Sequence, residues 1–147
     1  MRTWTLAAAF VAAALAAVSL AHAAAIDPGN WEFTVNMKAK GLGAFQPKPG
    51  PVVKNRCIGA EEASNPAKIL SDAAARGECA LSNQRDTGTE FSFDMKCTGR
   101  VPAHGTAKMR YSAQTLDGNV DLDGEAQGLR FSTKSQINAR RTGPCNS

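Results

Sequence analysis

Four cysteines constrain this chain more than any other feature of its sequence. Cys57, Cys79, Cys97 and Cys145 all follow an N-terminal stretch with the composition of an export signal. Cysteines in an exported domain usually pair, so two disulfides are expected. Two bridges would stabilise a small domain and limit the possible strand orders. They indicate architecture and compartment, and they point to no particular chemistry.

The first residues contain the three parts of a secretory signal. Arg2 is positively charged, Trp4 to Leu20 are apolar, and Ala21-His22-Ala23 is a small-x-small cleavage site. We expect cleavage after Ala23, with a competing site after Ala25. The apolar stretch is too short and too rich in alanine to predict a retained membrane span.

Removing residues 1–23 from the 147 leaves 124, which form a single domain at 24–147. The formal charge falls from +4 to +3 when Arg2 is lost. A charge of this size, spread over the domain, is no basic patch and argues against a nucleic-acid partner. The predicted location is the periplasm or the medium, with no membrane span after cleavage.

Apolar and polar residues alternate strictly in the first mature segment, which predicts a strand from Trp31 to Lys40. A Gly- and Pro-rich connection, Gly41 to Pro51, leads to a second strand near 52–58. One helix is predicted next, with Asn65 as its cap, Pro66 in its first turn and Gly77 as its stop. Strands at 79–85 and 89–97 then flank a turn at Asp86-Thr87-Gly88.

Two dipeptides predict the register of the C-terminal third. Asp117-Gly118 is typical of a two-residue hairpin, which would place Tyr111 opposite Gly124. A second tight turn at Gln127-Gly128 would place Phe131 opposite Gly124 from the other side.

The same register predicts ion pairs on the outer face of the sheet. Glu125 would lie between Arg110 and Arg130, and Asp121 would lie beside Lys134. Such cross-strand pairs are ordinary surface features, each contributing a few tenths of a kcal/mol.

The strand count also predicts the disulfides. In an antiparallel meander Cys79 and Cys97 lie at the same end of adjacent strands, whereas Cys145 comes three strands later, at the opposite end. Strands of this length span roughly 25–30 Å, but bridged Cα atoms lie within about 7 Å. We therefore expect Cys79–Cys97 and, by exclusion, Cys57–Cys145. A miscounted strand would favour Cys57–Cys79 with Cys97–Cys145 instead.

Catalytic and metal-binding constellations are not recognisable in the sequence. His104 is the single histidine after the signal, and we interpret it as a solvated loop residue. Asp121, Asp123 and Glu125 share one strand face, but their basic neighbours would keep them ionised, which does not suit a general acid. No catalytic residue, metal ligand or cofactor site is predicted.

The connection from Gly41 to Pro51 is the one segment whose composition favours a functional loop. It carries Leu42, Ala44 and Phe45 between glycines and prolines. Such a loop can cover a cavity or insert into a partner. The alternative is that Phe45 folds back onto the open end of the core.

Several short motifs together resemble a known bacterial family. The opening Pro28-Gly29-Asn30-Trp31-Glu32, the four-cysteine spacing and the ending Arg140-Arg141-Thr142-Gly143-Pro144-Cys145 look like the exported family catalogued as domain of unknown function three-six-one-seven. The resemblance implies an envelope location in Gram-negative bacteria and a β-rich fold. It implies no catalytic residues.

The predicted fold is mainly β: a single antiparallel sheet of about seven strands, curled into a half-barrel or small barrel, with one short helix on its end or open face. A two-sheet sandwich is the alternative. The leading functional hypothesis is a non-enzymatic periplasmic module that holds an apolar ligand on the concave face. The predicted ligand or partner contacts are Trp31, Phe33, Phe45, Phe91, Phe93, Tyr111 and Phe131.

Two other functions remain open at this stage. An envelope protein could bind a sheet edge or the Gly41 to Pro51 loop. A hydrolase using carboxylates is the third hypothesis.

Overall fold

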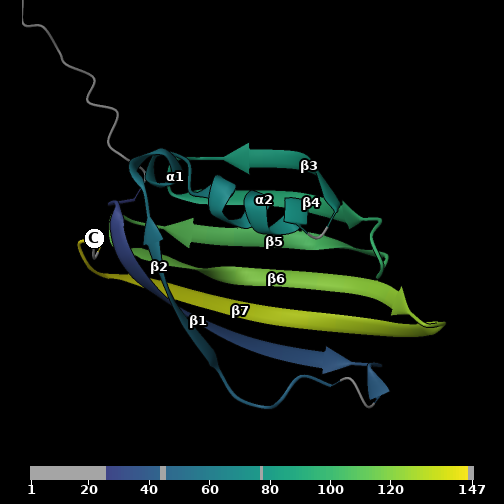
Figure 1. The fold of residues 1–147 in the computed structure, drawn as a ribbon. Coiled ribbons are helices and arrows are strands. Elements are labelled where there is room, and N and C mark those ends of the chain that lie inside the picture. Colours follow the sequence, from purple (N-terminus) through teal and green to yellow (C-terminus); the bar gives the residue numbers. More distant parts are fainter. Residues whose placement is uncertain (1–25, 44–45, 77, 146–147) are drawn as a thin grey trace, which may run out of the picture.

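Seven antiparallel strands in one sheet account for most of the described residues (Figure 1). This computed structural model describes residues 26–43, 46–76 and 78–145. The elements are β1 (Gly29–Lys40), β2 (Val52–Ile58), α1 (Ala60–Ser64), α2 (Ala67–Arg76), β3 (Cys79–Asp86), β4 (Glu90–Cys97), β5 (Ala103–Tyr111), β6 (Thr115–Ala126) and β7 (Leu129–Gly143).

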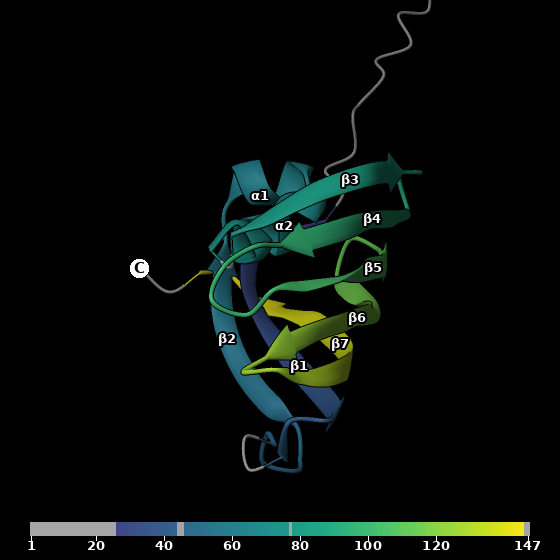
Figure 2. The same cartoon turned by 90° about the vertical axis from the view of Figure 1, so that its right-hand side faces the viewer.

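The strand order is β2-β1-β7-β6-β5-β4-β3, so β7 lies between β1 and β6, and β2 and β3 form the edges of the sheet. Figure 2 shows the sheet bent into an open half-barrel, with both helices on the side of β2 and β3. Helix α2 packs against β3 and β4. The single curled sheet is confirmed, and the sandwich is not found.

Two short helices replace the single predicted one. Helix α2 begins where expected, because the amide of Lys68 donates to the carbonyl of Asn65 over 3.0 Å. The preceding helix α1 was not predicted, since five residues are too few to show an apolar period. The predicted stop, Gly77, lies outside the described residues. Neither helix, nor any other within the described ranges, is long and apolar enough to cross a membrane.

Two of the predicted turns are confirmed. The Asp86 carboxylate accepts a hydrogen bond from the amide of Gly88 over 2.8 Å, which closes the turn between β3 and β4. Gln127 and Gly128 both have positive φ angles, 53° and 79°, as a two-residue hairpin of this kind requires.

The predicted hairpin at Asp117-Gly118 is wrong, because both residues lie inside β6. The chain turns earlier, where the amide of Ser112 donates to the carbonyl of Thr115 over 2.9 Å. Gly118 serves packing instead: a Cβ at this position would lie 2.5 Å from the sulfur of Met109. The glycine makes room for a core side chain, and no turn is needed.

Because of this misplaced turn, the predicted register is wrong on one side of β6 only. Tyr111 pairs with Leu116, and Gly124 pairs with Ala103, so the predicted Tyr111–Gly124 contact is wrong. For the same reason Arg110 lies opposite Asp117 and not beside Glu125.

On the β7 side of β6, the predicted register is confirmed. Gly124 pairs with Phe131 and Glu125 with Arg130. Asp121 pairs in register with Lys134, as predicted. The predicted ion pairs Asp121–Lys134 and Glu125–Arg130 are not among the salt bridges between described residues.

Both predicted disulfides are confirmed. Cys79 and Cys97 are register partners on β3 and β4, with Cα atoms 3.8 Å apart. Cys57 and Cys145 have Cα atoms 5.4 Å apart and connect β2 to the end of β7 across β1. The sheet order makes this second bridge possible, because β1 is the only strand between β2 and β7.

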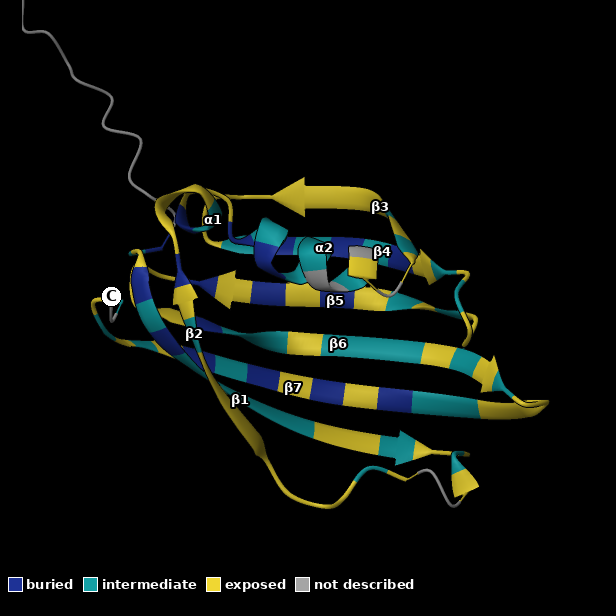
Figure 3. Cartoon of the chain, in the orientation of Figure 1, coloured by how far each residue is buried: buried dark blue, intermediate teal, exposed yellow. Residues whose placement is uncertain are grey.

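The core lies between the helices and the concave face of the sheet. Figure 3 shows buried and exposed residues alternating along the strands, as expected when one face is solvated. The buried apolar residues are Ile26, Trp31, Ile58, Ala63, Ile69, Phe91, Phe93, Met95, Ala107, Met109, Tyr111, Leu116, Ile137 and Ala139.

One end of the half-barrel is closed by the segment that precedes β1. The amide of Asp27 donates to Ala113 in the β5–β6 turn over 2.7 Å, and that of Ile26 donates to Ala63 of α1 over 3.2 Å. The indole of Trp31 donates to the carbonyl of Asp27 over 3.0 Å. We call this the closed end. The open end is formed by the ends of β1 and α2, the β4–β5 loop and the β6–β7 turn.

Candidate functional site

Most of the aromatic residues predicted to contact a ligand belong to the core. Trp31, Phe91, Phe93 and Tyr111 are between 0% and 7% exposed. The ring of Phe91 lies 6.0 Å from that of Tyr111 and 6.3 Å from that of Phe93, between centroids. These side chains belong to the buried core, where they stabilise the fold.

The other three predicted contacts lie in different surroundings. Phe33 is partly buried and packs against the core. Phe131 lies at the open end and borders hollows in the surface. Phe45 lies outside the described residues. The sequence therefore located one side chain of the candidate site, Phe131, among several core residues.

Two hollows on the concave side meet at Phe131. The inner hollow, of about 540 Å³, is lined by Arg76, Glu78, Cys79, Cys97, Gly99, Arg100, Val101, Ala103, Leu122 and Phe131. The rim hollow, of about 420 Å³, is lined by Gly41, Leu42, Arg100, Val101, Ala126, Gln127, Leu129 and Phe131. Both volumes fall within the range of small-molecule sites.

Small residues explain why the sheet is hollow here. Ala103, Gly124 and Phe131 lie side by side on β5, β6 and β7. A Cβ at Gly124 would lie only 2.7 Å from the Phe131 ring, so the ring covers the glycine. This close approach leaves space beside Ala103 that a larger side chain would fill. The aromatic cover of Gly124 predicted from the register is thus supplied by Phe131 alone.

The hollows combine an apolar lining with a charged rim. Arg76 ends α2, Glu78 follows it, and Arg100 lies in the β4–β5 loop. Val101 and Leu129, at the tips of the β4–β5 loop and the β6–β7 turn, are 45% and 58% exposed. Such a site can hold an apolar group inside and meet an acidic group at its mouth.

A family model matches residues 26–145 and is described as "Protein of unknown function (DUF3617)". The chain belongs to this family. The match covers every strand and helix of the structure, and it confirms the resemblance that the motifs indicated. No curated protein and no solved structure showed a significant match to the chain.

In this DUF3617 protein, His104 lies on β5 and not in a loop as predicted. It is exposed, and its register neighbours are Lys96 and Asp123. Beyond Asp123 on β7 lies Ser132. A nucleophile triad needs the histidine between the serine and the carboxylate, whereas here the aspartate occupies that position. The cross-strand order His104, Asp123, Ser132 therefore does not fit the nucleophile–base arrangement of a catalytic triad.

Two of the β6 carboxylates lie opposite cations on the next strand. Asp121 is paired in register with Lys134, and Glu125 with Arg130. Within the described part of the chain, no group of three or more His, Cys, Asp or Glu residues is placed to hold a metal ion. We expected these carboxylates to be cross-strand neighbours of basic residues, and the register agrees for Asp121 and Glu125.

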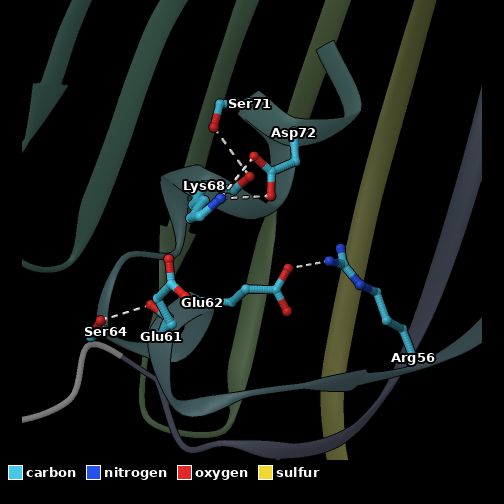
Figure 4. A network of polar contacts seen from close by, with 7 residues as sticks. All are labelled: Arg56, Glu61, Glu62, Ser64, Lys68, Ser71 and Asp72. Carbon is cyan, nitrogen blue, oxygen red and sulfur yellow. Dashed lines mark hydrogen bonds and ion pairs between the residues drawn. The ribbon is translucent and has the colours of Figure 1, made fainter. Parts of the chain in front are cut away.

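Polar contacts join α1 to the edge strand β2 and connect residues within α2 (Figure 4). Arg56 of β2 forms an ion pair with Glu62 of α1. Lys68 and Asp72 pair within α2 over 3.0 Å, and this carboxylate raises the pKa of the Lys68 ammonium group. The first contact joins α1 to β2, and the second lies within α2.

The sequence did not point to the residues that border Phe131 in the hollows. Arg76, Arg100, Val101, Leu122 and Leu129 come from four separate elements or turns. One signal was available: Gly99 to Pro102 is a turn-forming segment with an apolar residue at its tip. Its position beside the β6–β7 turn depends on the corrected register of β5.

Proposed function

We propose that this DUF3617 domain is a non-enzymatic binding module that takes the apolar part of a small molecule into the inner hollow. One observation carries the proposal: α1 and α2 fill only part of the concave face, and the remaining part contains a hollow of about 540 Å³. Leu122, Val101 and Phe131 supply apolar contacts. The polar groups of a ligand would remain at the mouth, near Arg76 and Arg100.

The proposed location is outside the cytoplasm, in the periplasm or secreted. Two disulfides between all four cysteines support this location, because such bridges persist in oxidising compartments. The proposed signal at residues 1–23 lies outside the described residues.

The proposal of a binding role, and not of catalysis, is supported by the surroundings of the titratable groups. His104 is exposed and lies between Lys96 and Asp123 in the register. The β6 carboxylates lie beside Lys134 and Arg130 on the outer face, away from the inner hollow. Neither arrangement positions a base next to a nucleophile.

Native mass spectrometry after gentle purification tests the proposal. The oxidised protein is expected to carry a bound mass that departs on denaturation. An Ala103→Leu variant places a larger side chain at the inner hollow and is expected to lose that mass. The matched control is Ala113→Leu, because Ala113 is exposed in the β5–β6 turn at the closed end. A bare wild-type protein, or equal loss in both variants, would contradict the proposal.

A second candidate function is protein interaction through the edge strand β2. Val52 and Val53 begin this strand and are 52% and 54% exposed, which is unusual for apolar residues on a free edge. A partner strand could pair with β2. Val53→Lys should then abolish partner capture without changing the bound mass. Unchanged capture would rule out this edge.

A further inference from the structure

The apolar residues at the tips of the open end face solvent in the isolated chain. Val101 in the β4–β5 loop is 45% exposed, and Leu129, directly after the β6–β7 turn, is 58% exposed. Both line the rim hollow, together with Leu42. Two apolar tips on neighbouring turns form a small surface that an apolar environment outside the protein could cover.

Cations surround these tips. In the four segments of the open end, 40–43, 76–80, 96–102 and 123–131, there are five cations and three anions. The cations are Lys40, Arg76, Lys96, Arg100 and Arg130. None of the five forms a salt bridge with another described residue, since the salt bridges join Arg56–Glu62, Lys68–Asp72, Lys108–Glu90 and Arg140–Glu32. Their charge is thus available to an external partner.

The closed end has the opposite balance. Its segments, 26–34, 53–64, 86–90, 110–117 and 138–145, contain five cations and seven anions. Two of these cations, Arg56 and Arg140, are held in salt bridges. The half-barrel is therefore polarised along its strands, and a negatively charged surface would attract the open end and repel the closed end.

We propose that the open end docks onto an anionic lipid surface, with Val101 and Leu129 entering the headgroup layer and Arg100, Arg130 and Arg76 meeting lipid phosphates. Apolar tips beside cations are the combination that binds membrane surfaces reversibly. The inference rests on the proposed function in one respect, since the docked face is the one onto which both hollows open. A ligand would then pass between the hollow and the bilayer without crossing water.

Co-sedimentation with lipid vesicles tests this inference on the oxidised protein. The wild type is expected to bind vesicles of equal parts phosphatidylglycerol and phosphatidylcholine, and to lose this binding in pure phosphatidylcholine or at high salt. Arg100→Gln with Arg130→Gln should weaken binding on the order of twentyfold. Val101→Ser with Leu129→Ser should weaken it about tenfold.

Matched controls use similar side chains elsewhere. Val53→Ser removes an apolar residue that is 54% exposed on β2, and Arg140→Gln removes a cation at the closed end. Both should bind vesicles like the wild type. No preference of the wild type for anionic vesicles, or equal weakening by the controls, would overturn the inference.

The failure of docking can be told apart from failure of the ligand site. Ala103→Leu should abolish the bound mass and leave vesicle binding unchanged, because Ala103 is not at a tip. The Val101→Ser and Leu129→Ser pair should reduce vesicle binding whether or not a bound mass is present. If Ala103→Leu loses vesicle binding together with the bound mass, a separate docking surface is contradicted.

Discussion

Tyr111→Phe removes one hydroxyl that joins two parts of the sheet. Tyr111 is 7% exposed, and its hydroxyl donates to the Asp86 carboxylate over 2.7 Å. The same oxygen of Asp86 accepts the amide of Gly88 over 2.8 Å. One carboxylate therefore connects β5 to the turn that follows the edge strand β3. The substitution keeps the ring and removes this connection.

The size of the effect follows from the lost hydrogen bond, and its pH dependence follows from the pKa of the phenol. Burial, and next the hydrogen bond to Asp86, raise the pKa of Tyr111 from 10.0 to about 12. This rise enters only the pH dependence, because burial, and not the hydrogen bond, is its largest cause. Asp86 is exposed, so solvent weakens the interaction, and we expect Tyr111→Phe to lower the free energy of unfolding by about 1–2 kcal/mol at pH 7.

The sign of the pH dependence follows from the direction of the shift. Because the pKa is higher in the folded state, the stabilisation is complete below pH 10 and is lost as the pH rises from 10 to about 12. Urea unfolding of both proteins across this range should show a constant difference up to pH 10. Above it, the difference should shrink, because only the wild type has a phenol to ionise.

Tyr111 is the single tyrosine of the chain, so ultraviolet absorbance of tyrosinate reports its ionisation directly. The folded protein should titrate well above the urea-unfolded one. Asp86→Asn should lower the folded-state pKa of Tyr111, since the charge on its acceptor is removed. A phenol that titrates near 10 in the folded protein, together with an unchanged stability of Tyr111→Phe, would refute the reasoning.

Three further outcomes are expected from urea unfolding at neutral pH. Replacing Cys57 and Cys145 by Ala should lower the free energy of unfolding by about 4–5 kcal/mol, because their bridge spans 88 residues; a loss under 1 kcal/mol would contradict this. Gly105→Ala should cost about 2–4 kcal/mol, because its Cβ would overlap the carbonyl oxygen of Asp121; a stable variant would show that β6 can shift. Arg140→Gln should cost under about 0.5 kcal/mol, because its ion pair with Glu32 is on the surface; a larger loss would show that this ion pair contributes more than a surface pair should.

Much of the fold could be predicted from local patterns. The alternation from Trp31 onward and the Gln127-Gly128 turn each depend on a few neighbouring residues, and both are confirmed. The disulfides followed from strand counting, which needs only the number of strands between Cys97 and Cys145. That number was right although one turn was misplaced.

The misplaced turn shows where local patterns fail. Asp117-Gly118 has the composition of a hairpin, but Gly118 lies beside Met109, and only the packing of β5 on β6 reveals this use. The prediction of the residues in the candidate site failed for a related reason. Trp31 and Phe131 look alike in sequence as inward-facing aromatic residues, and the position of the helices decides which one is covered.

The pairing of β1 with β7 places the earliest and the latest synthesised strands side by side. Glu32 and Arg140, 108 residues apart, form an ion pair across this junction. Contacts of such long range form slowly, and here they cannot begin until β7 has been made. The β3–β6 meander can assemble before then, but Cys57 cannot form its disulfide until Cys145 has been synthesised. A ribosome that stops before β7 would therefore release a chain that lacks the strand joining β1 to β6.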